Sequence, residues 1–341
     1  MKQRDVSVDI LRGLAIFSMI AANMAAHSLL EPHSFYFRLY GSLAAPLFVF
    51  LAGMMVSYTA TLKQHKLNYY LKRSLATLAV AALMDIFLWD IFPFSTFDVL
   101  YVIAFAMPLI FFFNKLNLWL KVGLIALLFA AAPLLQNYFL YQEYPVELVV
   151  SEMTSLGDIA NVPVLKQLFI DGWFPIFPWL GVSLIGGLIG SYKLKMNAED
   201  FGKNVMGVGL ILLLIGIFTW AVYRPELFIR EGYSELFYPP TVYYMMTYLG
   251  LILILLPLAF KTQQNKLLTW LSVYGRSSLL VYILHTVFII IVFYQIEPVS
   301  FVPFVGLYLC HAAVLWLICF GVQHFKKNRK FPFFLNFILG S

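Results

Sequence analysis

Apolar runs of about 20 residues divide the sequence, and this pattern restricts the fold more than any other feature. A helix needs about 20 apolar residues to cross a bilayer, where backbone hydrogen bonds must be satisfied internally. Of the 341 residues, 62% are hydrophobic and only 12% are charged, whereas soluble domains carry about 25% charged residues. The chain is therefore predicted to fold as an all-α, polytopic transmembrane helical bundle and not as a soluble enzyme.

Ten apolar runs are candidate spans, and together they predict a single transmembrane domain over residues 1–341. Their approximate bounds are 9–30, 40–61, 74–92, 97–114, 118–139, 172–192, 204–223, 240–260, 277–296 and 301–323. An even number of spans places both termini on one side of the membrane. The positive-inside rule makes that side cytoplasmic, because 19 of the 23 Lys and Arg residues then lie in the cytoplasmic layer. The four on the outside are Arg38, Lys166, Arg224 and Arg230.

This topology also accounts for the net charge of +6. We expect membrane lipids, and no nucleic acid, as partners of the basic residues. The predicted location is the bacterial cytoplasmic membrane, with the oligomeric state, monomer or homodimer, left open. Cys310 and Cys319 lie nine residues apart on one predicted helix, too far apart to form a disulfide, and both are predicted to be buried thiols. Neither a metal-ligand spacing nor a nucleotide-binding glycine loop is present, so no metal is expected.

The first predicted span carries four polar residues on one face. At 100° per residue, Asn23 lies about 20° from Arg12 around the helix axis. Asp9 and His27 both lie about 60° from Arg12. Charged groups inside a bilayer cost about 2.5–3.5 kcal/mol each, so they indicate function. The rise from Arg12 to Asn23 is about 16 Å, which suits an elongated ligand with an anionic head near the cytoplasm and a reactive tip near the outer surface.

Each polar residue also has a structural explanation. Asp9 and Arg12 could neutralise each other at the headgroup level. Asn23 could hydrogen-bond across helices, and His27 could be a satisfied histidine of the bundle. His33, in the next outer loop, could act as a general base near neutral pH or could be a surface residue without a role.

Two segments resemble a known family. Residues 8–16 read VDILRGLAI and are followed by Asn23, and residues 45–53 read APLFVFLAG. An Asp-x-x-Arg-Gly helix with an Asn near its outer end, an outer-loop His and a Pro-Phe-rich second helix resembles the catalytic-domain family of heparan-alpha-glucosaminide N-acetyltransferase. This family is a branch of the transmembrane acyltransferases. Weaker similarity occurs at residues 97–100, 177–181 and 274–279, so the match is specific over the first two spans and loose over the others.

The resemblance implies transfer of an acetyl group from cytoplasmic acetyl-CoA to an extracytoplasmic acceptor, typically a sugar amine. It implies that Asn23 donates a hydrogen bond to the thioester oxygen and that His33 deprotonates the acceptor amine or hydroxyl. An acyl-histidine intermediate is the alternative route. The loop before His33 is one residue shorter than in the family, so His27 is the reserve candidate for the catalytic histidine.

Other polar residues are predicted to bind the two substrates. Those predicted to bind acetyl-CoA in the cytoplasmic layer are Asp9, Arg12, Arg73 and Arg276. Arginine suits phosphate groups, and contact with lipid headgroups is the alternative. Those predicted to bind the acceptor outside are Arg38, Asp98 and Asp171. For the two aspartates, capping or heading a helix is the plainer alternative.

His285 and His311 fall near the middle of the last two predicted spans. A proton relay between them is conceivable, since ionisable residues at membrane depth are rare. Hydrogen bonding between adjacent helices is the simpler interpretation.

We therefore predict an acetyl-CoA-dependent transmembrane acetyltransferase acting on a sugar or glycan group. A secondary transporter of a small polar solute is the alternative from another class, because polar residues at depth are expected there too. The sequence lacks the paired Gly/Pro-broken helices in two matching halves that many transporters show. A third possibility, an O-acyltransferase of a surface polysaccharide, shares the donor and differs in the acceptor.

Overall fold

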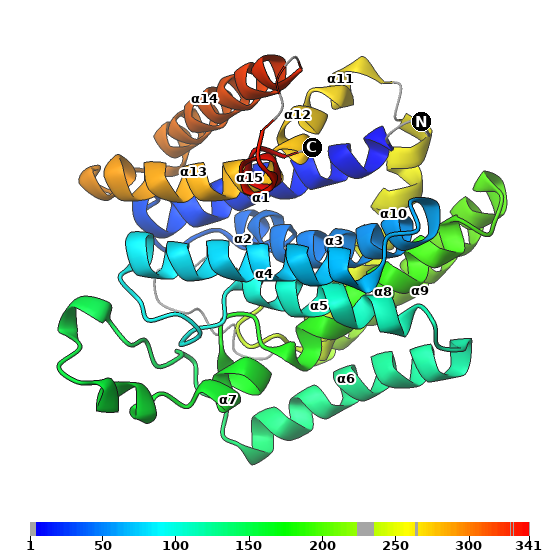
Figure 1. The fold of residues 1–341 in the computed structure, drawn as a ribbon, viewed down its shortest axis with the longest axis horizontal. Helices are drawn as coiled ribbons and strands as arrows, with labels where there is room; N and C mark the ends of the chain where they lie inside the picture. The colour runs from blue at the N-terminus through cyan, green and yellow to red at the C-terminus, as the bar shows by residue number, and fades with distance from the viewer. Residues whose placement is uncertain (1–4, 224–234, 263–264, 328, 330, 341) are drawn as a thin grey trace. The chain divides into compact units, whose positions relative to one another are not determined.

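The computed structural model of the chain is helical, and no β-strand occurs within residues 5–223, 235–262, 265–327, 329 and 331–340, which the structure describes. The α-helices in chain order are α1 (Val6–Ser28), α2 (Phe35–Gly41), α3 (Ala44–Leu62), α4 (Leu67–Met84), α5 (Val99–Phe113), α6 (Leu118–Tyr138), α7 (Val164–Lys166), α8 (Ile176–Lys193), α9 (Ala198–Val222), α10 (Val242–Thr262), α11 (Lys266–Thr269), α12 (Leu271–Arg276), α13 (Ser278–Ile291), α14 (Phe301–Lys326) and α15 (Phe333–Leu339). Figure 1 labels them. Short 3-10 or π-helical segments are η1 (Asp85–Trp89), η2 (Val150–Glu152), η3 (Leu156–Asn161), η4 (Gln167–Asp171) and η5 (Phe293–Gln295).

Each of the ten predicted spans coincides with a helix, which confirms the all-α polytopic class. Within the described parts, seven helices are long and apolar enough to cross a membrane, and a pair bent by 54°, Val164–Asp171 with Ile176–Lys193, would be an eighth. Among the predicted spans, α5 is apolar but short, and the first turns of α4 carry Lys72 and Arg73. The number of ten spans therefore stays a prediction.

The orientation of the chain in the membrane also stays a prediction. Five of the charged residues used to predict it, Lys2, Arg4, Arg224, Arg230 and Lys330, lie outside the described residues.

The two cysteines differ in their surroundings. Cys319 is buried, as predicted. Cys310 is exposed, so the prediction of a buried thiol was wrong there. The two residues are nine apart on α14 and so point in different directions around a helix that is buried on one side only.

The chain forms two compact units. The first comprises Met1–Phe48, Ile229–Leu236 and Leu251–Ser341, and the second comprises Val49–Phe228 and Phe237–Gly250. The first unit thus holds α1, α2 and α11 to α15, and the second holds α4 to α9. The prediction of a single domain over residues 1–341 stays a prediction.

In the first unit, α1 packs closely against α12 because glycines leave room for the two backbones. A Cβ atom on Gly13 would overlap the carbonyl group of Leu271, and a Cβ atom on Gly275 would overlap the carbonyl group of Asp9. Small residues permit such close approach between membrane helices. In Figure 1, α1 (blue) runs beside α12, and α13 and α14 also pack against it.

Two tyrosines fix α14 against the other helices of this unit. The Tyr308 hydroxyl donates to the Phe17 carbonyl of α1 at 2.9 Å and lies 3.0 Å from the Tyr40 hydroxyl. The Tyr274 hydroxyl of α12 donates to the Ala312 carbonyl at 2.5 Å. A buried hydroxyl needs a partner, so these bonds set the register of α14 around residues 308–312.

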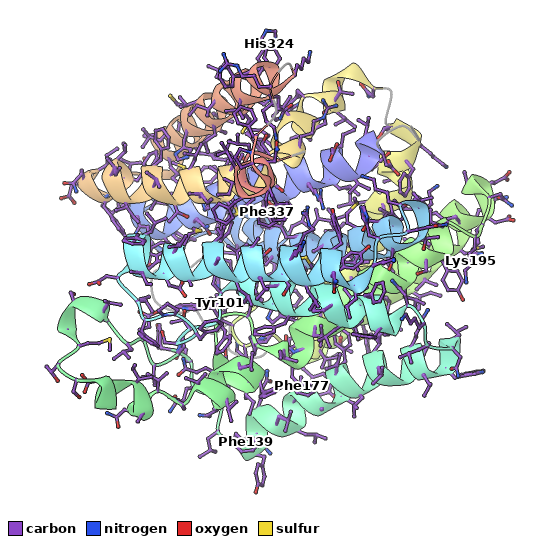
Figure 2. The ribbon with its side chains drawn as sticks, viewed as in Figure 1. Tyr101, Phe139, Phe177, Lys195, His324 and Phe337 are labelled. Atoms are coloured by element: carbon purple, nitrogen blue, oxygen red, sulfur yellow. The ribbon has the colours of Figure 1, made fainter. Side chains whose placement is uncertain are left out.

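The second unit uses the same kind of close packing. A Cβ atom on Gly53 of α3 would overlap the carbonyl group of Ser183 in α8, and a Cβ atom on Gly186 would overlap that of Phe50. Tyr101, labelled in Figure 2, is fully buried on α5, and its hydroxyl donates to the Asp85 carboxylate. α5 also packs against α4 and α8.

The glycine contact between α1 and α12 leads to a stability prediction. Gly275→Ala should destabilise the protein by about 1–3 kcal/mol, because the new methyl group meets backbone atoms that cannot move aside alone. Gly306→Ala on α14 is the matched control, since a Cβ atom there meets nothing within 4 Å. Thermal unfolding in detergent measures both variants, and equal melting temperatures would contradict the tight contact.

Candidate functional site

Asp9, Arg12, Asn23 and His27, the four polar residues predicted to share one face, lie on α1 within the first unit and form the α1 stripe. Asp5 caps the helix by accepting a hydrogen bond from the Ser7 backbone N–H at 3.1 Å. Asp9 is buried, whereas Arg12, Asn23 and His27 are half-buried. The four polar side chains are therefore spaced along a helix whose other residues are mostly buried and apolar.

Asp9 forms an ion pair with Arg276 at the end of α1 that is predicted to be cytoplasmic. The Nε atom of Arg276 lies 3.8 Å from Oδ2 of Asp9, with the Asp9 side chain 3% exposed and the Arg276 side chain 42% exposed. Because Gly275 lets α12 approach the Asp9 backbone, the next residue, Arg276, is placed beside the carboxylate. The exposed part of the guanidinium is accessible to a ligand. The structure thus brings together two of the four residues predicted to bind acetyl-CoA.

Asn23 is hydrogen-bonded to His285 of α13, a contact that the sequence did not indicate. The Asn23 Nδ2 and His285 Nε2 atoms are 2.9 Å apart, and His285 Nδ1 lies 3.1 Å from the Val281 carbonyl oxygen. A carbonyl only accepts, so Nδ1 carries the imidazole proton and Nε2 accepts from the Asn23 amide. The Asn23 amide is therefore oriented by a neutral histidine that is 1% exposed.

The two histidines predicted for catalysis lie beyond Asn23, toward the C-terminal end of α1 and the following loop. The His27 ring packs edge-on against Tyr294, with 4.4 Å between ring centroids. The Nε2 atom of half-buried His33 lies 3.2 Å from the Leu29 carbonyl oxygen, to which it donates. Leu29 follows Asn23 by six residues, about 9 Å along a helix. His27 is therefore one turn from Asn23, and His33 is held at the end of the helix.

Arg38 is buried in the same unit beside an acidic residue. Glu235, also buried, lies close enough for its charge to act on the Arg38 guanidinium. The Ser42 hydroxyl links the two segments, because it donates to the Arg38 carbonyl at 2.7 Å and accepts from the Leu236 N–H at 2.8 Å. The predicted acceptor contact Arg38 thus sits in a charge-compensated and nearly solvent-free position.

Three predicted site residues belong to the second unit. Arg73 donates to the Tyr69 hydroxyl at 3.5 Å and lies over its ring. Asp98 caps α5 by accepting from the Val99 N–H at 2.6 Å. Asp171 is fully buried and pairs with Lys166 at 2.9 Å. The capping alternative is therefore present for Asp98, whereas Asp171 is the last residue of η4 and α8 begins at Ile176 with Pro175 as its N-cap. The predicted binding roles of both aspartates stay predictions.

His285 joins this site through its hydrogen bond with Asn23, whereas the sequence offered it only a proton relay with His311 or hydrogen bonding between adjacent helices. Its position in the middle of an apolar run was the available signal. The pairing with Asn23 depends on how α1 and α13 pack, and no periodicity within either helix reveals that.

Comparison with known families identifies the family of this chain. The sequence matches the family described as heparan-alpha-glucosaminide N-acetyltransferase, catalytic, over residues 4–224. It also matches a family described as a protein of unknown function (DUF418) over residues 195–327. No curated protein matches the chain in sequence. The first match spans nearly two thirds of the chain and contains the whole α1 stripe, and the chain therefore belongs to the catalytic-domain family of heparan-alpha-glucosaminide N-acetyltransferase, a family of membrane acyltransferases.

Proposed function

We propose that this membrane acyltransferase moves an acetyl group from cytoplasmic acetyl-CoA to an amine or hydroxyl group of a sugar or glycan on the extracytoplasmic side. The observation that carries the proposal is the α1 stripe in its folded setting. Arg12 and the ion pair of Asp9 with Arg276 lie near one end of α1, and Asn23, which is hydrogen-bonded to His285, lies about 16 Å from Arg12 along the helix. The bacterial cytoplasmic membrane is the proposed location.

Arg12 and Arg276 are the proposed contacts for the phosphates of CoA. Arg276 pairs with Asp9, three residues before Arg12 on α1, and the Arg276 side chain is only partly covered. Asp9 orients Arg276 and offsets part of its charge when no ligand is bound. Arg73 of the second unit is a further proposed contact, held by Tyr69.

Asn23 is the proposed group that stabilises the reacting thioester. One amide N–H is bonded to His285, which leaves the second N–H for the carbonyl oxygen of the acetyl group. Negative charge builds on this oxygen as the acceptor nitrogen or oxygen bonds to the carbonyl carbon. When the C–S bond breaks, CoA leaves as a thiolate, and the proton lost by the acceptor restores its thiol.

His33 is the proposed base for the acceptor, with His27 in reserve. A base takes the acceptor proton as the new bond forms, so it must lie on the acceptor side of Asn23, as both histidines do along the chain. Attack by the imidazole itself would give an acyl-histidine intermediate. Arg38, Asp98 and Asp171 stay the proposed contacts for the acceptor.

Acetyl-CoA should raise the melting temperature of the purified protein in detergent. A ligand at 100 times its dissociation constant stabilises the native state by about 2.7 kcal/mol. Glucosamine alone is the control and should give little shift. Absence of a shift at millimolar acetyl-CoA would contradict the proposal and favour the transporter alternative.

Arg12→Ala and Arg276→Ala should each weaken acetyl-CoA binding by roughly tenfold or more, because each removes a charge-assisted hydrogen bond to phosphate. Lys203→Ala is the matched control, since this lysine lies on the exposed surface of α9 in an ion pair with Glu199. Titration of the thermal shift against acetyl-CoA concentration gives the affinities. Unchanged affinity in Arg12→Ala would make Arg12 a structural residue.

His33→Ala should abolish acetyl transfer to glucosamine and retain the acetyl-CoA thermal shift, because the base acts on the acceptor and does not bind the donor. His27→Ala is the comparison variant and should keep most of the activity. Release of the CoA thiol is the measurement. Full activity in His33→Ala together with loss in His27→Ala would move the catalytic role to His27.

A further inference from the structure

His311 of α14 is a buried histidine that lacks hydrogen-bond partners. Its side chain is 5% exposed, and neither Nδ1 nor Nε2 has a partner within the part of the chain that the structure describes. Buried polar groups nearly always have a partner, and leaving one unmade is costly. An imidazole that keeps both nitrogens unpaired inside an apolar unit therefore indicates a missing ligand or water.

The His311 ring is held in place by aromatic side chains and by the register of its helix. It stacks on Phe293 with ring centroids 5.1 Å apart and meets Phe288 edge-on at 5.2 Å. The hydroxyl bonds of Tyr308 and Tyr274 fix α14 on both sides of this residue. The orphaned nitrogens are thus presented in a defined place.

The His311 ring meets Phe288, which follows His285 by three residues on α13, so the two imidazoles lie within about one helical turn of each other along α13. His285 cannot supply the missing partner, because Nδ1 donates to the Val281 carbonyl and Nε2 accepts from Asn23. The three residues Asn23, His285 and His311 therefore form one polar cluster inside the first unit. Two N–H groups of this cluster stay available, the second N–H of Asn23 and the ring N–H of His311.

We propose that His311 is a second donor to the carbonyl oxygen of the acetyl thioester, so that it and Asn23 together bind the oxyanion. This inference rests on the proposed acetyltransferase function and adds a residue beyond the 4–224 family match. As the acceptor bonds to the carbonyl carbon, the electron pair of the C=O bond moves to oxygen, and the two N–H groups hold that charge. The charge returns when the C–S bond breaks, and His311 keeps its proton throughout.

His311→Phe is the primary test, because a phenyl ring suits the Phe288 and Phe293 contacts and has no donor. In proteoliposomes supplied with acetyl-CoA, CoA thiol release should fall by about 100-fold or more in kcat, with KM for acetyl-CoA nearly unchanged. Hydrolysis by water and transfer to glucosamine should fall by the same factor, because the donor acts on the thioester and not on the acceptor. His324→Phe, at the exposed end of the same helix and labelled in Figure 2, should behave as wild type.

A second pair of variants tests the N–H donor of residue 311 without introducing a phenyl ring. His311→Gln and His311→Met have similar size, but only Gln carries an N–H donor, so Gln should retain more activity than Met. Melting temperatures verify that each variant is folded, and His311→Phe should melt no lower than wild type because it removes an unpaired polar group. Combining His311→Phe with Asn23→Ala should cost less than the product of the single losses, since both act on one oxygen.

The outcomes separate this inference from the proposed function. A wild-type protein that neither shifts with acetyl-CoA nor releases thiol overturns both. A functional wild type with unchanged kcat in folded His311→Phe, or equal activity of the Gln and Met variants, overturns only the role of His311. In that case the orphaned nitrogens hold a structural water.

Discussion

The close approach of α1 and α12 is the contact on which the rest of the first unit depends. At Gly13 and Gly275 the backbone of one helix lies where the other would carry a side chain. This approach brings Arg276 beside Asp9 and seals the carboxylate from solvent. In lipid, where the hydrophobic effect does not drive helices together, close van der Waals packing of this kind stabilises their association. The charge pair is therefore a consequence of the backbone contact, and the glycines following Arg12 and preceding Arg276 are part of the site.

Several buried polar residues of the unit are explained by their partners. The amide of Asn23 and both nitrogens of His285 take part in hydrogen bonds, and the hydroxyls of Tyr308 and Tyr274 bond to backbone carbonyls. Satisfied polar groups of this kind hold helices in register. His311 departs from the pattern, and an unsatisfied group in a well-packed region is where a function is expected.

The sequence predicted the helices well because span length and apolar composition are local properties. All ten apolar runs correspond to helices, and Asn23 does lie on a helix with Asp9, Arg12 and His27. The partners were not predictable in the same way. The sequence offered Arg12, three residues on, as one possible partner of Asp9. The ion pair of Asp9 with Arg276 could not be foreseen, because a contact between distant helices depends on their packing. For the same reason, the hydrogen bond between Asn23 and His285 could not be predicted from the sequence.

The site residues of the first unit come from both matched segments of the sequence. Arg12, Asn23 and His33 lie within residues 4–224, whereas Arg276, His285 and His311 lie within residues 195–327. In the fold, α12 and α13 supply the partners of Asp9 and Asn23. A segment with only a supporting role would not need an arginine partner for the buried Asp9 and two buried histidines, since apolar residues would pack there at lower cost. We therefore propose that the C-terminal helices supply part of the proposed catalytic site.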